Sequence, residues 1–373
     1  MEDERKCHVL LLYRVMIPSI RLCGHCQMEE LARQGKIEYR ACQELSVKGS
    51  DLNWADVVLL GRLDSWYEYQ LTKKLKEAKK YLIYIIDDDL LNIPPEISSA
   101  AYYVRKEIQG YIRGMIEMSD AIMSPSPILL EKYAINGRTA IQMEEPAIDP
   151  VSYKPHDTNK PVKIGFAGSV DRTGDIESIL RDTLIQIKQE FGDSVQFEFF
   201  GAHPSFADEI DARCIPYCDS YDEYRNTLNS MEWDIGLAPM QDTAFHTCKH
   251  YNKFIEYAAA GCMAIFSDVY PYVFLKEKGI DSVFCENERE HWYRRLRVAI
   301  ANDKWREEKR DSFCTIAQSV FGLACIVDGF REKNSWVFDY RATNREYHYR
   351  IEGIKAFGFM LRIMNRLLRI FKR

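Results

Sequence analysis

The segment from residue 233 to residue 272 constrains the fold more than any other part of the chain, because it reads as a strand, a polar loop, a helix and a second strand. Residues 235–238 form a short apolar run, and Pro239 ends it because proline cannot donate a hydrogen bond to a sheet ladder. Gly261 ends the following helix, and residues 263–266 form the next apolar strand. The segment therefore predicts a strand–helix–strand unit with a polar loop at the carboxyl end of its first strand.

Charged residues gather where this loop enters the helix, which we expect to begin near Cys248. Lys249, Lys253 and Glu256 follow one another at spacings of four and three, so they share one face of a helix. The free N–H groups and the dipole of a helix start favour an anion, and a lysine there is a candidate phosphate ligand. The alternative is a plain α/β unit in which the lysines are solvated and Glu256 pairs with one of them.

The same alternation runs through most of the chain. Apolar strands are predicted at residues 8–12, 55–60, 81–86, 120–123, 162–167 and 196–200, and helices at 67–80, 128–133 and 175–191. A proline-rich stretch without periodicity, residues 144–161, reads as an interdomain linker. We therefore predict an α/β fold with parallel, doubly wound sheets in two domains, 1–150 and 160–335, and a tail over 336–373.

Composition narrows the range of partners and compartments. The chain has 373 residues, 46% of them hydrophobic, enough for two cores. A net charge of −6 argues against a nucleic-acid partner. Eleven cysteines are scattered through apolar runs with no signal peptide before them, which predicts reduced thiols in a cytoplasmic protein. The CGHC run at 23–26 has no second cysteine pair to complete a zinc site, so no metal is assigned there.

The motifs DIGLAP, KFIEYAAAG and the strand followed by Ser267 and Asp268 resemble the donor site of GT-B glycosyltransferases, especially the retaining family numbered four. The resemblance covers roughly residues 6–312 and implies two Rossmann-like domains facing across a cleft. It also implies transfer of a sugar from a nucleotide-sugar donor, with no further cofactor and with Glu256 accepting hydrogen bonds from the ribose. Many members carry a glutamate near the transferred sugar where this chain has Cys248.

A glycine-containing loop, GSVDRTG at 168–174, follows the strand 162–167. Glycine lets a backbone approach a ligand closely, and an arginine can grip phosphate oxygens through two N–H groups. The resemblance implies that Gly168, Ser169 and Arg172 cradle the donor diphosphate. Where relatives often have a lysine this chain has Asp175, so Arg172 and Lys249 would share the diphosphate charge. His246, in the loop before the helix, is a candidate to face the donor sugar, with a hydrogen bond inside the loop as the alternative. Arg172, Lys249 and His246 are the predicted catalytic residues.

Three aspartates, Asp87 to Asp89, follow the predicted strand 81–86. They resemble the metal-binding signature of the GT-A fold, and a metal-dependent transferase is the alternative that this triplet keeps open. We favour instead an acceptor-side role for Asp88, together with Arg21 in the loop after the first strand, and expect a metal-independent enzyme. An inverting enzyme would need a base, for which Asp64, Asp88 and His25 are candidates.

The tail from residue 351 to residue 373 has helical periodicity. Its basic stripe comprises Lys355, Arg362, Arg366, Arg369 and Arg373, and its opposite face carries Phe357, Met360, Leu361, Met364, Leu367, Leu368 and Phe371. We predict attachment to the anionic inner face of a membrane, with packing of the apolar face on the first domain as the alternative. A lipid-linked or cell-envelope acceptor and a role in polysaccharide biosynthesis follow. The rival function is a non-catalytic nucleotide-sugar or glycan binding module.

Overall fold

The computed structural model describes residues 5–148, 150, 159–218 and 220–370, with the side chains of 365–370 left out. The chain forms two compact units. The first takes the chain up to Pro95, Ser99–Glu144 and everything from Ile326 onward, and the second takes Glu96–Ser98 and Glu145–Cys325. The end of the chain thus belongs to the first unit, whereas the sequence suggested a second domain up to residue 335 and a separate tail.

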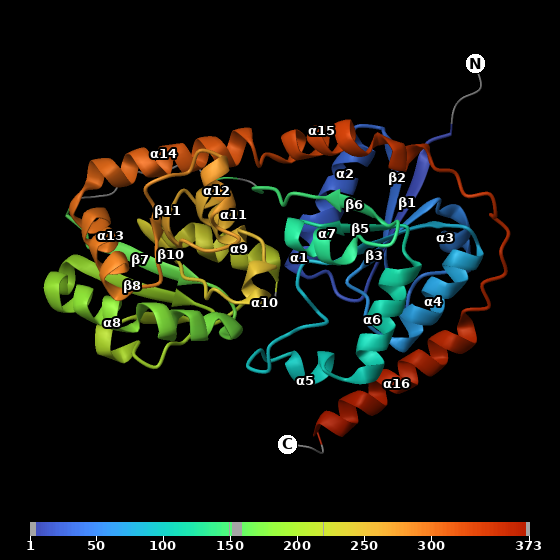
Figure 1. Ribbon diagram of the computed structural model, residues 1–373, viewed down its shortest axis with the longest axis horizontal. Helices are drawn as coiled ribbons and strands as arrows, with labels where there is room; N and C mark the ends of the chain where they lie inside the picture. Colours follow the sequence, from blue (N-terminus) through green and yellow to red (C-terminus); the bar gives the residue numbers. More distant parts are fainter. Residues whose placement is uncertain (1–4, 149, 151–158, 219, 371–373) are drawn as a thin grey trace. The chain divides into compact units, whose positions relative to one another are not determined.

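The first unit contains a parallel sheet of six described strands in the order β2-β1-β3-β4-β5-β6 (Figure 1). The strands are β1 Cys7–Tyr13, β2 Ile37–Gln43, β3 Val57–Gly61, β4 Tyr81–Ile85, β5 Ala121–Ser124 and β6 Thr139–Gln142. The helices are α1 Pro18–Ile20, a π-helical turn Arg21–His25, α2 Cys26–Arg33, α3 Gly49–Trp54, α4 Trp66–Glu77, α5 Ala100–Tyr103, α6 Lys106–Met118, α7 Pro127–Tyr133, most of α15 Leu323–Asn334, the 3-10 turn Ser335–Asp339 and α16 Glu352–Ile370. Strand β3 is buried along its whole length, as its unbroken apolar sequence predicts for a parallel sheet with both faces covered.

The second unit contains a parallel sheet of six described strands in the order β12-β11-β10-β7-β8-β9. The strands are β7 Val162–Ala167, β8 Val195–Phe200, β9 Arg213–Ile215, β10 Ile235–Ala238, β11 Met263–Ser267 and β12 Phe284–Cys285. The helices are the 3-10 turn Val170–Arg172, α8 Thr173–Phe191, the 3-10 turns Gly192–Ser194 and Asp208–Ile210, α9 Tyr221–Met231, α10 Ala244–Thr247, α11 Asn252–Ala259, α12 Phe274–Glu277, α13 Arg289–Ala301 and α14 Asp303–Ser319. The predicted α/β class with doubly wound parallel sheets is confirmed.

Two predicted helix starts were wrong. The helix expected from Asp175 begins at Thr173, directly after the 3-10 turn Val170–Arg172. The helix expected near Cys248 is two helices, because α10 ends at Thr247 and α11 begins only at Asn252. Lys249 therefore lies in the connection between them and not on the first turn of α11.

The strand orders locate a switch point in each sheet, where neighbouring strands have connections that leave in opposite directions. It lies between β1 and β3 in the first sheet and between β7 and β10 in the second. In open α/β sheets the carboxyl ends of such strand pairs form the usual ligand-binding crevice. These two edges are therefore the first places to look for a site.

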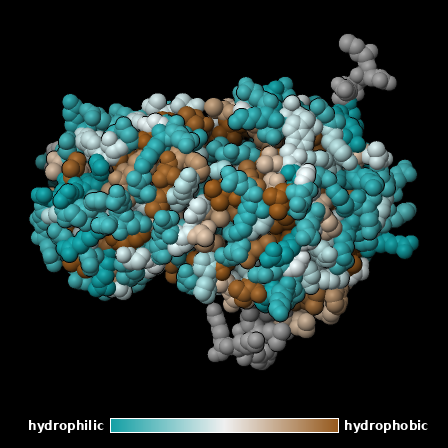
Figure 2. Space-filling model, in the orientation of Figure 1, coloured by the Kyte–Doolittle hydropathy of each residue, from teal (hydrophilic) through white to brown (hydrophobic). Residues whose placement is uncertain are grey.

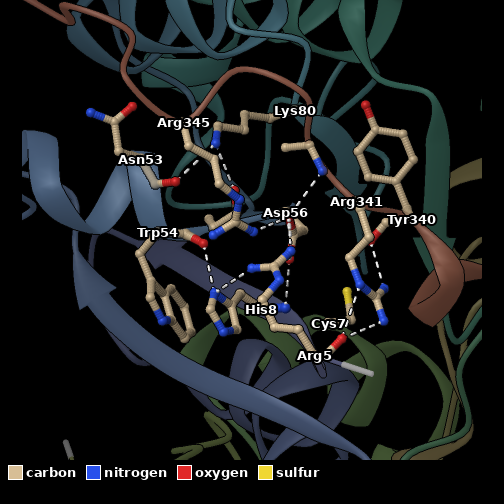
Figure 3. Close-up of polar contacts among 12 residues, drawn as sticks. Arg5, Cys7, His8, Asn53, Trp54, Asp56, Lys80, Tyr340, Arg341 and Arg345 are labelled. Atoms are coloured by element: carbon tan, nitrogen blue, oxygen red, sulfur yellow. Dashed lines mark hydrogen bonds and ion pairs between the residues drawn. The ribbon is translucent and has the colours of Figure 1, made fainter. Parts of the chain in front are cut away.

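Asp56 fastens the returning end of the chain to the first unit (Figure 3). Its buried carboxylate accepts hydrogen bonds from the backbone N–H groups of His8, at 3.0 Å, and Ala342, at 2.9 Å. The guanidinium groups of Arg5 and Arg345 also bind it. Burial alone would raise the pKa of Asp56, but these hydrogen bonds favour the charged form and lower it. An ionised carboxylate thus joins the start of β1 to the segment before α16.

Helix α16 packs on α4 with its basic side inward, where the sequence had suggested an outward basic stripe. Lys355 donates to the Val47 carbonyl, and Arg362 binds the buried carboxylates of Glu44 and, at 2.9 Å, Glu68. Glu352 of this helix is exposed, and so are four large apolar side chains, with exposed fractions of 56% for Phe359, 52% for Met360, 46% for Ile363 and 48% for Met364. Hydrophobic residues are visible at the lower edge of the molecule in Figure 2. The alternative of packing on the first unit is therefore observed, with the basic side chains bound to buried carboxylates; of the predicted apolar face, Phe357 contacts Trp66 while Met360 and Met364 stay exposed.

The predicted residues Arg366, Arg369, Leu367 and Leu368 lie outside the described side chains, and Phe371 and Arg373 lie outside the described residues. Within the described part of the chain, no single helix is long and apolar enough to cross a membrane. The consecutive helices at 303–319 and 323–339 meet that test of length and composition only when taken together.

Candidate functional site

The predicted donor residues lie in the segments that follow β7 and β10, the strands of the switch point of the second sheet, with Lys253 and Glu256 on α11. The loop after β7 is tied to the neighbouring strand, since the Gly168 N–H donates to the Phe200 carbonyl at 2.9 Å. Gly201, which follows, has φ of +81°, and a Cβ there would lie 2.4 Å from the Gly168 carbonyl oxygen. Only glycine fits position 201, and the close approach fixes the backbone at Gly168. Ser169 precedes the 3-10 turn in an extended conformation.

Arg172 is bound by the carboxylate of Asp175. The sequence analysis had noted Asp175 only because relatives often have a lysine there. Its Nε lies 2.7 Å from Oδ2 of Asp175, and its Nη2 donates to the Pro239 carbonyl at 2.9 Å. Asp175 is 2% exposed. The arginine is thus fixed between the loops that follow β7 and β10, and part of its charge is already balanced. The spacing of three residues at the start of α8 was the available sequence signal for this pair.

His246 faces the same carboxylate from α10. Its Nε2 lies 3.6 Å from Oδ1 of Asp175, and its Nδ1 is 2.7 Å from the Thr243 hydroxyl. Burial, helped by the charges of Arg172 and Lys249, lowers the pKa of His246 below its ordinary value, although Asp175 opposes the shift. The imidazole is therefore neutral at pH 7. The structure brings Arg172 and His246, two of the three predicted catalytic residues, to one buried aspartate.

Glu256 lies on α11 and is gripped by two side chains. Its Oε2 accepts hydrogen bonds from Lys253 Nζ at 2.6 Å and from the Tyr224 hydroxyl at 3.0 Å. Tyr224 comes from α9 and was not predicted; burial, reinforced by the nearby Glu256 charge, raises the pKa of its hydroxyl, so the phenol stays protonated and donates. The predicted pairing of Glu256 with a lysine is therefore observed with Lys253. Lys249 instead places its Nζ 4.5 Å from the centre of the Phe245 ring.

The acidic triplet after β4 is used in ion pairs. Asp87 and Asp88 lie 2.9 and 3.4 Å from Nη1 of Arg62, and Asp89 lies 2.5 Å from Nζ of Lys132. Within the described residues no group of three histidines, cysteines or acids is placed to hold a metal ion. The triplet therefore serves at least partly to pair with basic residues of its own unit.

The other candidates of the first unit lie after β1 and β3. Arg21 opens the π-helical turn Arg21–His25, whose His25 has Nδ1 2.8 Å from the Tyr39 hydroxyl. Asp64 is buried and lies 2.6 Å from Arg14. Burial raises the pKa of Asp64, against the effect of Arg14. Asp88 lies 3.4 Å from Arg62, and the acceptor-side role of Arg21 and Asp88 stays a prediction.

No protein-family model matches the chain, and no curated protein matches its sequence. Solved structures do match. A glycosyltransferase from Rickettsia africae aligns with a TM-score of 0.57 and 14% identity over 89% of this chain and 98% of its own. HepE of Anabaena, solved with UDP and glucose, aligns with a TM-score of 0.56 and 10% identity over 88% of this chain and 99% of its own. An α-glucosyltransferase solved with UDP and a DNA 13-mer aligns with a TM-score of 0.59 and 11% identity over 89% of this chain and 99% of its own.

The chain has a GT-B fold. The full-length alignments include both units, which confirms the fold that the motifs of the second half suggested. In the GT-B fold of this chain, the candidate donor residues occupy the switch point of the second sheet.

Proposed function

We propose that this protein is a glycosyltransferase that moves a sugar from a nucleotide-sugar donor to a glycan or lipid-linked acceptor. The observation that carries the proposal is the convergence of Arg172, His246 and Asp175 at the β7–β10 switch point of a GT-B fold, with Glu256 on a helix that follows β10. Two of the three similar structures named above were solved with UDP, so uridine diphosphate sugars are the first donors to test.

Each donor residue would contact a different part of the nucleotide. Glu256, held by Lys253 and Tyr224, would accept hydrogen bonds from the ribose hydroxyls. Gly168 and Ser169 would bring backbone N–H groups to the diphosphate, and Lys249 and Arg172 would stabilise the charge that grows on it. This stabilisation by side chains supports a reaction without an obligatory metal.

The transfer breaks the bond between the sugar's anomeric carbon and the diphosphate oxygen and forms a bond from that carbon to the acceptor oxygen. In the retaining course that we propose, the leaving phosphate oxygen takes the proton of the acceptor hydroxyl, so no side chain has to act as base. The neutral His246 is suited to a hydrogen bond with the donor sugar, because its uncharged ring can donate or accept.

Membrane attachment is the second part of the proposal. We infer that α16 lies at the inner face of a membrane, with Phe359, Met360, Ile363 and Met364 in the acyl boundary. In the sequence the same helix continues with Arg366 and Arg369, which suit anionic headgroups. A cytoplasmic enzyme at this surface fits a lipid-linked or cell-envelope acceptor and a role in polysaccharide biosynthesis.

A donor assay tests the transferase directly. Binding of UDP and release of nucleoside diphosphate would be measured with UDP-, GDP- and dTDP-sugars, with and without EDTA, on the wild type, Glu256→Gln and the exposed control Glu277→Gln. We expect one donor class to be consumed in EDTA, with about tenfold weaker UDP binding in Glu256→Gln only, as for a lost charge-assisted hydrogen bond. UDP binding unchanged in Glu256→Gln would overturn the site.

The same assay separates the rival functions. Release abolished by EDTA would show a metal-dependent transferase. Binding of a donor that is never consumed, with any acceptor, would identify a binding module; Cys248, which replaces the family's glutamate and donates to the Ala244 carbonyl at 3.3 Å, is the observation that favours this rival.

Vesicle flotation tests the membrane contact. The double variant Phe359→Ser, Ile363→Ser should lose binding to vesicles with anionic lipid by on the order of tenfold, because two apolar side chains leave the bilayer boundary. Ile135→Ser, which changes a residue that is 49% exposed elsewhere on the first unit, is the matched control. Equal flotation of all three proteins would rule α16 out as the attachment.

A further inference from the structure

The first unit contains a cavity of about 480 Å³ that none of the predicted site residues lines. It is enclosed by residues around the start of α4, by α6 with the turn before it, and by α16. Its lining residues are Arg14, Ser65, Trp66, Tyr67, Tyr102, Arg105, Glu107, Ile108, Tyr111, Gly358, Leu361 and Arg362. The volume is within the range of small-molecule sites.

The cavity lies at the switch point of the first sheet. Arg14 directly follows β1, and Ser65 follows β3 by a few residues at the start of α4. Because β1 and β3 are neighbours with connections on opposite sides, their carboxyl ends form the crevice where doubly wound sheets bind ligands. The cavity therefore occupies in the first sheet the position that the candidate donor residues occupy in the second.

Its wall is aromatic and half-exposed. Trp66, Tyr102 and Tyr111 line it and are each partly accessible, and Trp66 is braced by Phe357 of α16 with ring centres 4.9 Å apart. Flat aromatic faces with polar edges suit a ligand that has an apolar C–H face and a polar rim. A pyranose ring is such a ligand.

The arginines of the cavity are paired with carboxylates. Arg14 lies 2.6 Å from Asp64 and 3.5 Å from Glu68, and Arg362 lies 2.9 Å from Glu68. Arg105 pairs with Glu107 at 3.1 Å. The cavity thus offers guanidinium donors and carboxylate acceptors of fixed orientation with little excess positive charge. Hydroxyl groups, which both donate and accept, fit this lining better than a phosphate does.

We propose that this cavity binds an uncharged sugar ring of the acceptor, stacked on the aromatic wall and hydrogen-bonded by Arg14, Arg105 and Arg362. The inference rests on the proposed transferase function and names the substrate class of its acceptor side. Because Gly358, Leu361 and Arg362 of α16 form one wall, the sugar binds beside the helix that we assign to the membrane surface. The acceptor is then a saccharide whose lipid carrier lies next to α16.

Saccharide binding to the full chain tests the cavity. A panel of neutral oligosaccharides and their acidic counterparts, uronic-acid and phosphorylated, would be titrated and followed by saturation-transfer NMR, with UDP titrated in parallel. The variants are Tyr111→Ala, Tyr111→Phe and Arg105→Gln, and the control is Arg113→Gln, an exposed change on the same helix that does not line the cavity. Circular dichroism confirms that each variant is folded.

We expect a neutral oligosaccharide to bind the wild type and Arg113→Gln equally, and to bind Tyr111→Ala and Arg105→Gln about tenfold more weakly, as for one lost aromatic or charged contact. Tyr111→Phe should keep most of the affinity, and UDP should bind all variants alike. Affinity unchanged in Tyr111→Ala and Arg105→Gln, binding of acidic saccharides only, or no saccharide binding by a chain that binds UDP would overturn the inference. Absence of UDP binding in the wild type would instead contradict the donor site.

Discussion

A buried carboxylate lies at the switch point of each sheet. The two carboxylates differ in how far along the chain their partners lie. Asp175 binds Arg172 and His246, which lie in segments that the sequence had singled out. Glu68 accepts hydrogen bonds from the backbone N–H groups of Asp64, at 2.7 Å, and Ser65, at 2.6 Å, and pairs with Arg14 and Arg362. Glu68 thus joins the first strand, the start of α4 and the last helix. One site is assembled locally, and the other depends on a contact that spans almost the whole chain.

Removal of Glu68 should have the largest effect. In Glu68→Ala the charges of Arg14 and Arg362 lose a buried partner and α4 loses its cap, so we expect the first unit to lose about 3–5 kcal/mol of unfolding free energy. Hydrogen exchange should become faster over residues 57–77 and 352–364 and stay unchanged over 162–191. The control Glu131→Ala changes an exposed residue of α7. Unchanged exchange in α16 would contradict the link between the cavity and the end of the chain.

Asp175→Asn should have a smaller and more local effect, because asparagine keeps the shape and some hydrogen bonds. Arg172 then lacks its carboxylate, and we expect a loss of about 2–3 kcal/mol in the second unit. UDP binding should weaken by about tenfold as Arg172 and His246 lose their positions. Asp182→Asn, an exposed change on the same helix, is the control. UDP affinity equal to that of the wild type would show that Asp175 does not position the donor residues.

The same contrast explains what the sequence could predict. Apolar runs and breakers identified the eight inner strands of the two sheets but missed the four edge strands β2, β6, β9 and β12. A motif of about forty residues suggested the donor site, because its determinants are close together in the chain. The pairing of Arg172 with Asp175 could have been predicted, because the two residues have helical spacing. The break between α10 and α11 was not, because residues 248–251 carry no proline or glycine to signal it.

The cavity of the first unit could not be predicted from the sequence. Periodicity put Lys355 and Arg362 on one stripe of residues 352–364, but it cannot tell which face of a helix is buried. The basic face is buried because Glu44 and Glu68 bind Arg362 and hold it against the first unit. These two residues lie about three hundred positions earlier in the chain. The acceptor-side prediction accordingly named Arg21 and Asp88, whereas the residues that line the cavity are Arg14, Arg105 and Arg362. Non-local ion pairs have no signature in a single sequence.

The smallest effect that we expect is a pH dependence caused by His246 in the second unit. The folded-state pKa of His246 lies below its unfolded value of about 6.5, so the unfolded chain binds this proton first. The contribution of His246 to stability is therefore complete above pH 6.5 and is lost as pH falls toward the lower, folded pKa. Once protonated, the imidazolium adds a positive charge beside Arg172 and Lys249. UDP-glucose, whose diphosphate does not titrate in this range, should then bind about threefold more tightly below the lowered pKa of His246 than at pH 7.5. His246→Gln should bind it equally at both pH values. If the gain in affinity at low pH persists in His246→Gln, another group titrates. The contact between His246 and Asp175 would then have no role in donor binding.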